Sequence, residues 1–202
     1  MNREALASKI PRVRKTDRET QVKEQLLTTG EVERLIRGAA TRTQRLLIML
    51  PYETGARCGE IANLRIRDLQ FDEFSAILAL TGKSGTRKRR VYASIPGLRS
   101  HLNDHPLKDN PEAPLFLTQY GTGFGYPAIY DMIRKLGQKV LKRRIHPHQL
   151  RHSKATVDSR HFTDREMMQL YGSETPLMVG VYSHLRMRDV DEKDLTLHGL
   201  KL

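Results

Sequence analysis

The spacing of the apolar residues changes character only once along this chain of 202 residues, between positions 69 and 95. In that stretch apolar residues fall at every second position on both sides of a turn at residues 82–85, which predicts a β-hairpin. The alternating residues are Ile77, Ala79, Val91, Ala93 and Ile95. Elsewhere the apolar residues recur every three or four positions, as in helices. We therefore expect an α+β fold that is mainly helical, with a small antiparallel β-sheet on one side.

Threonines mark where several of these helices begin. A side-chain oxygen just before a helix can accept a backbone hydrogen bond, and a Glu or Gln three positions later can return one. Three pairs have this spacing, namely Thr28 with Glu31, Thr41 with Gln44 and Thr163 with Glu166. Pro127 suits the first turn of another helix, where its missing N–H costs nothing. A turn at Thr54 and Gly55 precedes a short helix, on which Arg57 and Glu60 share a face.

The charge balance narrows the class of partner. The chain has 35 Lys and Arg against 23 Asp and Glu, a formal net charge of +12, and such a surface attracts polyanions. The longest apolar run, residues 46–50, is far shorter than the roughly 20 residues of a membrane span. The charged N-terminus lacks the apolar block of a secretory signal, and Cys58 is the single cysteine. We expect a soluble cytoplasmic protein, associated with the nucleoid and not with a membrane.

Positive charge is concentrated in two segments. Residues 132–157 contain eight Lys and Arg and three His but no Asp or Glu, which an ordinary solvated helix face does not require. The predicted hairpin carries a second basic cluster close to its turn. The candidate DNA-binding residues are Arg87, Lys88, Arg89, Arg90, Lys139, Lys142, Arg143 and Arg144. These clusters favour double-stranded DNA as the partner, bound through its phosphates. The alternative is a basic surface that only keeps the protein in solution.

A motif of histidine and arginine lies within the acid-free segment. His148, Arg151 and His152 occur at helical spacing, so one helix face presents three hydrogen-bond donors. Histidines four positions apart also suit zinc, but no Asp, Glu or Cys lies nearby to complete a ligand set, and an arginine shares the face. We therefore expect this motif to bind phosphate, and we expect no metal and no cofactor.

Four motifs follow one another in a distinctive order. They are Thr54-Gly55-Ala56-Arg57 with Glu60-Ile61, then Gly82-Lys83 on the hairpin, then His148-x-Leu150-Arg151-His152, and finally Tyr182. In that order they resemble the tyrosine recombinases, the family of phage integrases and Xer proteins. The resemblance covers about residues 28–199, and the segment from Tyr182 onward looks like archaeal integrases in particular. It implies the fold of that family's catalytic domain.

The resemblance also implies a role for each matching residue. It places the catalytic groups at Arg57, Lys83, His148, Arg151, His152 and Tyr182, with Glu60 as the acidic companion of the first arginine. The tyrosine would attack a DNA phosphodiester, while guanidiniums and a histidine stabilise the charge that builds up at phosphorus. The lysine would protonate the departing 5′ oxygen. The implied 3′-phosphotyrosyl link conserves bond energy, so two duplexes can recombine through a Holliday junction without ATP.

The chain departs from the family pattern at two places. The family usually has His or Trp about nine residues before the nucleophile, after Leu-Gly or Phe-Gly, whereas here Ser173 follows Tyr171-Gly172. Ser173 is a candidate active-site residue on this ground, and its short side chain predicts slow cleavage. Family members also carry an N-terminal DNA-binding domain, whereas residues 1–27 here are expected to form only a basic arm or linker.

We expect a catalytic domain at residues 28–185 and a C-terminal tail at residues 186–202. The tail holds four Lys and Arg and four Asp and Glu, a balance that suits a protein partner better than DNA. In the resembling family such a segment docks on a neighbouring protomer. We therefore expect a homo-oligomer, with a tetramer on the DNA synapse and a monomer when free. The alternative is a tail that folds back on its own protomer.

These expectations together indicate a site-specific DNA recombinase, or integrase, of a mobile genetic element. Two alternatives from other functional classes stay open. One is a DNA-binding protein on the same fold that is catalytically weak or inactive, because of Ser173 or of the short N-terminal arm. The other is a topoisomerase of type IB, which uses the same tyrosine chemistry only to relax supercoils.

Overall fold

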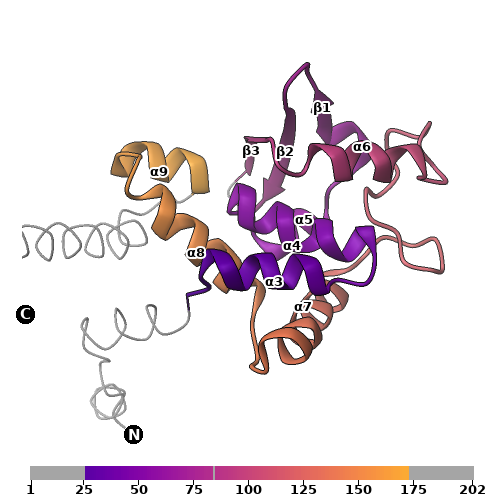
Figure 1. The fold of residues 1–202 in the computed structure, drawn as a ribbon. Coiled ribbons are helices and arrows are strands. Elements are labelled where there is room, and N and C mark those ends of the chain that lie inside the picture. The colour runs from indigo at the N-terminus through magenta and orange to yellow at the C-terminus, as the bar shows by residue number, and fades with distance from the viewer. Residues whose placement is uncertain (1–25, 84, 173–202) are drawn as a thin grey trace, which may run out of the picture.

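The computed structural model describes residues 26–83 and 85–172, which form seven α-helices and a three-stranded antiparallel sheet. The helices are α3 (Thr29–Gly38), α4 (Arg42–Thr54), α5 (Cys58–Ala62), α6 (Ile95–Asn103), α7 (Tyr126–Leu141), α8 (Pro147–Asp158) and α9 (Asp164–Tyr171). The strands are β1 (Leu69–Phe71), which follows the 3-10 turn η1 (Ile66–Asp68), β2 (Ala76–Gly82) and β3 (Gly85–Val91). The sheet lies on one side of the helices, with α3 and α7 on the other side (Figure 1). The predicted α+β class is confirmed.

The helices begin where the threonine spacing predicts. At the start of α3 the Glu31 backbone N–H donates to the Thr28 hydroxyl across 3.2 Å, and the Thr28 N–H donates to the Glu31 carboxylate across 2.9 Å. The same reciprocal pair opens α9 at Thr163, and Thr41 caps α4. Helix α4 ends at Gly55 with φ +63, a left-handed conformation that glycine adopts without steric cost. The local sequence therefore determines the helix boundaries around the site.

The predicted hairpin is confirmed as β2 and β3, and the residues that it buries are not all those on which the alternation rested. The buried residues of β2 are Ala76, Leu78 and Leu80, on the face opposite to Ile77 and Ala79. Two leucines bury more apolar area than one isoleucine and one alanine, so they decide which face turns inward. Beyond β3 the chain does not stay extended as the alternation predicts, because Ile95 already begins α6.

Helix α4 is the centre of the hydrophobic core. It packs against α3, α5, α6, α7, α8 and β3. Its residues Leu46, Leu47, Ile48 and Leu50 are at most 1% exposed, as expected for a helix with neighbours on all sides. The core also includes Leu27, whose backbone N–H donates to the Ser153 hydroxyl across 2.7 Å. Leu27 is thus packed into the same core as the helices that follow it.

Helix α8 runs from this core to α9, which lies at the edge of the main body (Figure 1). Helix α9 packs against α8 and against β3, through a small cluster of Ala155, Met167 and Tyr171. The last turn of α9 is therefore held between the helix that carries the histidine and arginine motif and the hairpin. Within the described ranges, no helix is long and apolar enough to cross a membrane.

Candidate active site

The first predicted site residue, Arg57, precedes α5 and is paired with Glu60. The buried Glu60 carboxylate accepts from the Arg57 backbone N–H across 2.7 Å and from the Arg57 guanidinium across 3.1 Å. Glu60 is 3% exposed, whereas the Arg57 side chain is 37% exposed. The carboxylate thus fixes the inner edge of a guanidinium whose outer part faces solvent, an arrangement suited to binding an anionic ligand.

The second predicted arginine, Arg151, is almost completely buried on α8. Its guanidinium donates to the Gly55 carbonyl across 2.6 Å and to the Tyr171 carbonyl across 2.8 Å. Gly55 has no room for a side chain, because a Cβ there would lie 2.3 Å from the Tyr171 ring. The turn that ends α4 therefore needs glycine both for its backbone conformation and for this contact.

The C-terminal end of α9 is bound by three arginines that come from three different elements. The last carbonyls of a helix have no partner within the helix and carry its negative dipole end. Here the Leu170 carbonyl accepts from Arg87, the Tyr171 carbonyl from Arg151 and the Gly172 carbonyl from Arg57, across 2.7, 2.8 and 3.4 Å. The two arginines singled out by the sequence thus meet at the residues that lead directly to position 173.

Tyr171 fills the space beneath this cluster. Its ring lies 5.0 Å from the Arg151 guanidinium and 5.5 Å from that of Arg89, both at cation–π distance. Its hydroxyl donates to the Asp158 carboxylate across 2.8 Å. Burial and the neighbouring carboxylate of Asp158 raise the pKa of Tyr171 far above its usual value. Tyr171 is therefore a structural anchor and is unsuited to act as a phenolate nucleophile.

The two motif histidines lie one turn apart on α8, with ring centroids separated by 6.4 Å. The imidazole of His148 is partly covered by its neighbours. This partial burial, together with the charges of Arg151 and Arg57, lowers the pKa of His148. Burial, His148 and Arg151 lower the pKa of His152 to about 4. Both imidazoles are therefore neutral near pH 7 and can each donate one N–H without adding charge.

Lys83 stands at the tip of the hairpin, next to the last residue of β2. Its side chain is exposed. A Cβ on the neighbouring Gly82 would lie 3.1 Å from a Glu60 carboxylate oxygen, so the hairpin tip reaches the same carboxylate that holds Arg57. The structure therefore brings Arg57, Glu60 and the backbone beside Lys83 together, as the order of motifs suggested.

The basic run on β3 does not form one continuous DNA-facing cluster. Arg87 is 10% exposed and paired with Glu60 across 2.7 Å, while Arg89 is 8% exposed and paired with Asp158 across 3.5 Å. Arg90 is exposed but forms an ion pair with Asp72. A strand turns alternate residues to opposite faces, and the inward face here meets two carboxylates. Of this run, Lys88 alone is exposed and has no ion pair within the described part of the chain.

The basic residues around the end of α7 differ from this run. Lys139, Lys142 and Arg144 are exposed, and Lys142 takes the left-handed conformation that ends the helix. Arg143 is half-buried and donates to Glu31 across 2.8 Å, which ties the end of α7 to the start of α3. Three of the four predicted DNA-binding residues in this segment are thus available to solvent.

Some predicted residues lie outside the described part of the chain. These are the nucleophile Tyr182, the substituted position Ser173 and the whole tail at residues 186–202. Cys58, by contrast, is buried in the core, and burial raises its pKa to about 11. No group of three His, Cys, Asp or Glu that could hold a metal ion occurs within residues 26–83 and 85–172.

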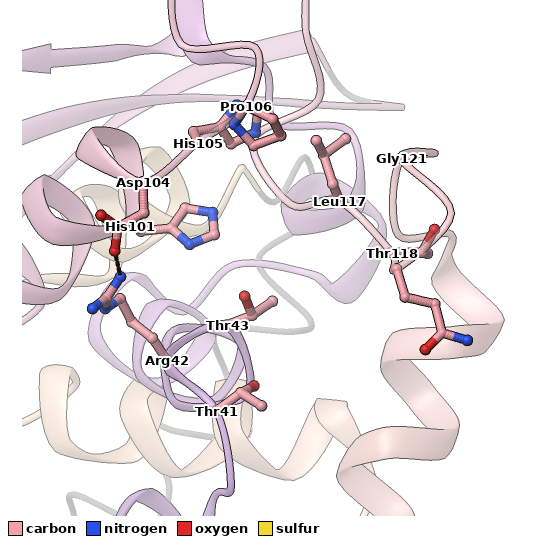
Figure 2. A pocket seen from close by; sticks show the side chains of 11 residues that line it. Thr41, Arg42, Thr43, His101, Asp104, His105, Pro106, Leu117, Thr118 and Gly121 are labelled. Atoms are coloured by element: carbon pink, nitrogen blue, oxygen red, sulfur yellow. Dashed lines mark hydrogen bonds and ion pairs between the residues drawn. The ribbon is translucent and has the colours of Figure 1, made fainter.

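A cavity of about 480 Å³ lies between the start of α4 and the end of α6, apart from the residues described above (Figure 2). Figure 2 shows Arg42 paired with Asp104 at one side of this cavity. The ring nitrogens of His101 and His105 lie 2.8 and 3.1 Å from backbone carbonyls at residues 115 and 114. These imidazoles therefore serve the packing of a loop, and we assign them no part in the site.

One residue and one contact at this site escaped the sequence analysis. Asp158 was not recognised, although a carboxylate that ends an otherwise acid-free stretch is a detectable departure. The pairing of Arg87 with Glu60 crosses 27 positions of sequence, and nothing in the local pattern indicates it. Only the fold brings β3 against α5.

The mainly helical fold, with arginines from three elements meeting at one helix end, agrees with the family that the sequence motifs resemble. The chain belongs to the phage integrase family, whose model matches residues 25–189. The tyrosine recombinase XerC of Lacticaseibacillus casei is 33% identical over 181 residues, which cover 81% of this chain and 59% of XerC. The tyrosine recombinase XerD of Bifidobacterium longum is 26% identical and covers 86% of this chain. The chain spans about three fifths of the length of these relatives.

Solved structures agree with this family assignment. The crystal structure of the XerA recombinase matches with a TM-score of 0.70 at 28% identity, over 88% of this chain and 66% of XerA. The XerH recombinase in a post-cleavage complex with its palindromic difH substrate matches with a TM-score of 0.70 at 21% identity. That match covers 86% of this chain and 53% of XerH. The fold of a tyrosine recombinase catalytic domain is thus confirmed.

Proposed function

We propose that this chain is the catalytic part of a site-specific DNA recombinase that cleaves and rejoins strands through a 3′-phosphotyrosyl intermediate. The observation that carries the proposal is the meeting of Arg57 and Arg151 at the C-terminal end of α9. Ten residues beyond Gly172 the sequence places Tyr182, the tyrosine that matches the family nucleophile. The family relatives are tyrosine recombinases, which supports the same chemistry here.

In the proposed reaction the Tyr182 oxygen attacks the phosphorus of a DNA phosphodiester. The Tyr182 hydroxyl releases its proton to solvent as the bond from phosphorus to its oxygen forms. The bond to the 5′ oxygen breaks, and Lys83 gives a proton to that leaving oxygen. A 5′ hydroxyl of a second strand reverses the step and displaces the tyrosine. Phosphodiester is exchanged for phosphodiester, so neither ATP nor a redox partner is needed.

The arginines and histidines stabilise the charge that builds up on the phosphoryl oxygens. Arg57 and Arg87 pair with the carboxylate of Glu60, whereas Arg151 donates to two backbone carbonyls, so the charges of these four residues sum to +2. This excess suits a phosphorane with two negative charges, in a site where the donors already hold fixed positions. The neutral His148 and His152 add N–H donors to the same oxygens.

The substrate of this reaction is double-stranded DNA, and solved relatives such as XerH are bound to their DNA substrates. We expect contact through the exposed cations Lys88, Lys139, Lys142 and Arg144. The protein works at the nucleoid in the cytoplasm, where duplex DNA is found.

Four protomers form the synapse, and the tail at residues 186–202 docks on a neighbouring protomer. Truncation after Leu185 should then reduce synapsis more than single-duplex binding, while equal loss of both favours a tail that folds back in cis.

The function is tested with a nicked suicide substrate built from genomic fragments that the protein binds. Release of the short strand after cleavage traps the covalent complex. A protease-sensitive DNA adduct is expected, and its absence would favour a DNA-binding protein without activity. Exchange of strands between two labelled duplexes separates a recombinase from a topoisomerase, which relaxes supercoiled DNA but exchanges nothing.

A further inference from the structure

We propose that Arg87 is a positioning residue of the active site and not a DNA contact. It holds Arg57 and the hairpin lysine Lys83 in fixed positions relative to each other. The inference rests on the proposed function. Arg87 joins three elements that are distant in the sequence, namely β3, on which it lies, α5 and α9. Each of these elements carries or precedes one part of the catalytic machinery.

The contact with α5 controls Arg57 through Glu60. One oxygen of the Glu60 carboxylate accepts from the Arg57 guanidinium across 3.1 Å, and the other accepts from Arg87 across 2.7 Å. The carboxylate is 3% exposed and carries a guanidinium on each side. The Arg57 backbone N–H donates to the same oxygen as Arg87, across 2.7 Å. These three donors leave the carboxylate little freedom to rotate, so Arg87 contributes to the orientation in which Glu60 holds Arg57.

The contact with α9 fixes the base of the segment that leads to the proposed nucleophile. Arg87 donates to the Leu170 carbonyl across 2.7 Å, at the helix end where a positive charge is favourable. A Cβ at Gly172 would lie 3.1 Å from Cδ of Arg87, so the Arg87 side chain passes directly over the glycine that ends α9. Arg87 also lies four residues after Lys83 on the same hairpin, which ties the tip of that hairpin to the site.

The hydrogen bonds of Arg87 indicate that its side chain serves to position other residues of the site. Its Nε is, within the described ranges, the one buried side-chain nitrogen or oxygen that has no hydrogen-bond partner. An unpaired buried donor costs stability and in native structures calls for an explanation. The explanation here is that the two terminal nitrogens of the guanidinium donate to Leu170 and Glu60. In that orientation Nε faces no acceptor. Burial lowers the pKa of Arg87, and the Glu60 carboxylate beside it opposes that effect.

The test separates positioning from DNA contact by measuring binding and cleavage independently on the full chain. Arg87→Met keeps the length of the side chain but removes the charge, and Lys88→Met makes the same change at the exposed neighbour. For Arg87→Met we expect the dissociation constant for uncleaved duplex to change less than twofold, and its salt dependence to stay the same. Cleavage at saturating DNA should fall by about 10²-fold, because a small misplacement of reacting groups costs that much.

Lys88→Met is expected to act on binding. It should weaken duplex binding several-fold and lower the salt slope by about one, an effect on binding that Arg87→Met does not share. Arg87→Lys retains a charge beside Glu60 but cannot bridge to Leu170 with a planar fork, so about a 10-fold loss of cleavage is expected. Arg87→Lys also keeps the inference testable if Arg87→Met fails to fold.

Three results would overturn the inference. One is an Arg87→Met protein whose binding weakens and whose salt slope falls while bound DNA is cleaved at the wild-type rate. Another is an Arg87→Met protein that merely melts at a lower temperature and cleaves normally when folded, and the third is an Arg87→Lys protein with full activity. A wild-type chain that forms no adduct would instead contradict the proposed function, so the two failures are distinguishable.

Discussion

The run of four basic residues on β3 and the four basic residues around the end of α7 are equivalent in composition but not in structure. On β3, alternate arginines turn inward to meet Glu60 and Asp158, and Lys88 alone is exposed without an ion pair among the described residues. Around the end of α7, only Arg143 is tied to a carboxylate, and its three neighbours face solvent. The comparison supports the proposal that the exposed cations bind DNA, whereas the buried ones organise the proposed active site.

The largest effect on this difference between buried and exposed cations is expected when the buried guanidinium of Arg151 is removed. Arg151→Ala deletes two hydrogen bonds to carbonyls and one positive charge from the site. Cleavage of the suicide substrate should fall by at least about 10³-fold, since the transition-state charge loses a fixed donor. Duplex binding should change less than threefold. A loss that appears mainly in binding would place Arg151 with the exposed cations and break the comparison.

A second prediction concerns the buried imidazole of His152. Its pKa is about 4 in the folded protein and about 6.5 when unfolded, so the unfolded chain binds more protons between these values. The contribution to stability is complete above pH 6.5 and is lost as the pH falls toward 4, on the order of 3 kcal/mol. Urea unfolding between pH 7 and pH 4.5 measures it. His152→Gln should flatten this dependence, and an unchanged slope would show that the pKa of His152 is the same in the folded and unfolded protein.

A substitution at Ser173 is predicted to increase the cleavage rate, whereas the substitutions above decrease it or change stability. The residue directly follows Gly172, whose carbonyl accepts from Arg57. Ser173→His would restore a donor of the kind that the family usually has there, and cleavage should rise by about 10-fold. Ser173→Ala serves as the control and should be slower than wild type. If neither variant changes the rate, the position has no part in the chemistry.

The smallest effects are expected for the exposed cations. Binding of duplex DNA should weaken with salt, with a log-log slope near −5 if about five or six phosphates are neutralised. Lys139→Ala, Lys142→Ala and Arg144→Ala should each lower affinity several-fold and reduce the slope by about one. Arg89→Met, on the buried face, should leave the slope unchanged. A flat salt response of the wild-type protein would remove the phosphate-based account of binding.

Local chemistry explains why so much of the fold could be predicted. The threonine caps place the starts of α3, α4 and α9, because those hydrogen bonds form within four residues. The hairpin follows from its alternation and glycine turn. The burial of Leu78 in place of Ile77 could not be predicted, because both faces of β2 carry apolar residues and only tertiary packing distinguishes them.

Less of the site than of the fold could be predicted from the sequence. Motif order singled out Arg57, Glu60 and Arg151. The structure brings Arg57 and Arg151 to the end of α9 and pairs Glu60 with Arg57, whereas their catalytic roles stay a prediction. The inward direction of Arg87 and Arg89 was missed, because their carboxylate partners lie 27 and 69 positions away. A basic run in sequence carries no information about such distant partners, so charge alone assigned these arginines to DNA.

The most direct test of the central claim is to identify the residue that joins DNA. The wild-type chain is incubated with a nicked suicide substrate, and the trapped peptide is mapped by mass spectrometry. We predict a 3′-phosphate adduct on Tyr182, and none with Tyr182→Phe, which keeps the ring and should still bind duplex DNA. An adduct that persists in Tyr182→Phe, or one that maps to Tyr171 despite its bond to Asp158, would contradict the account.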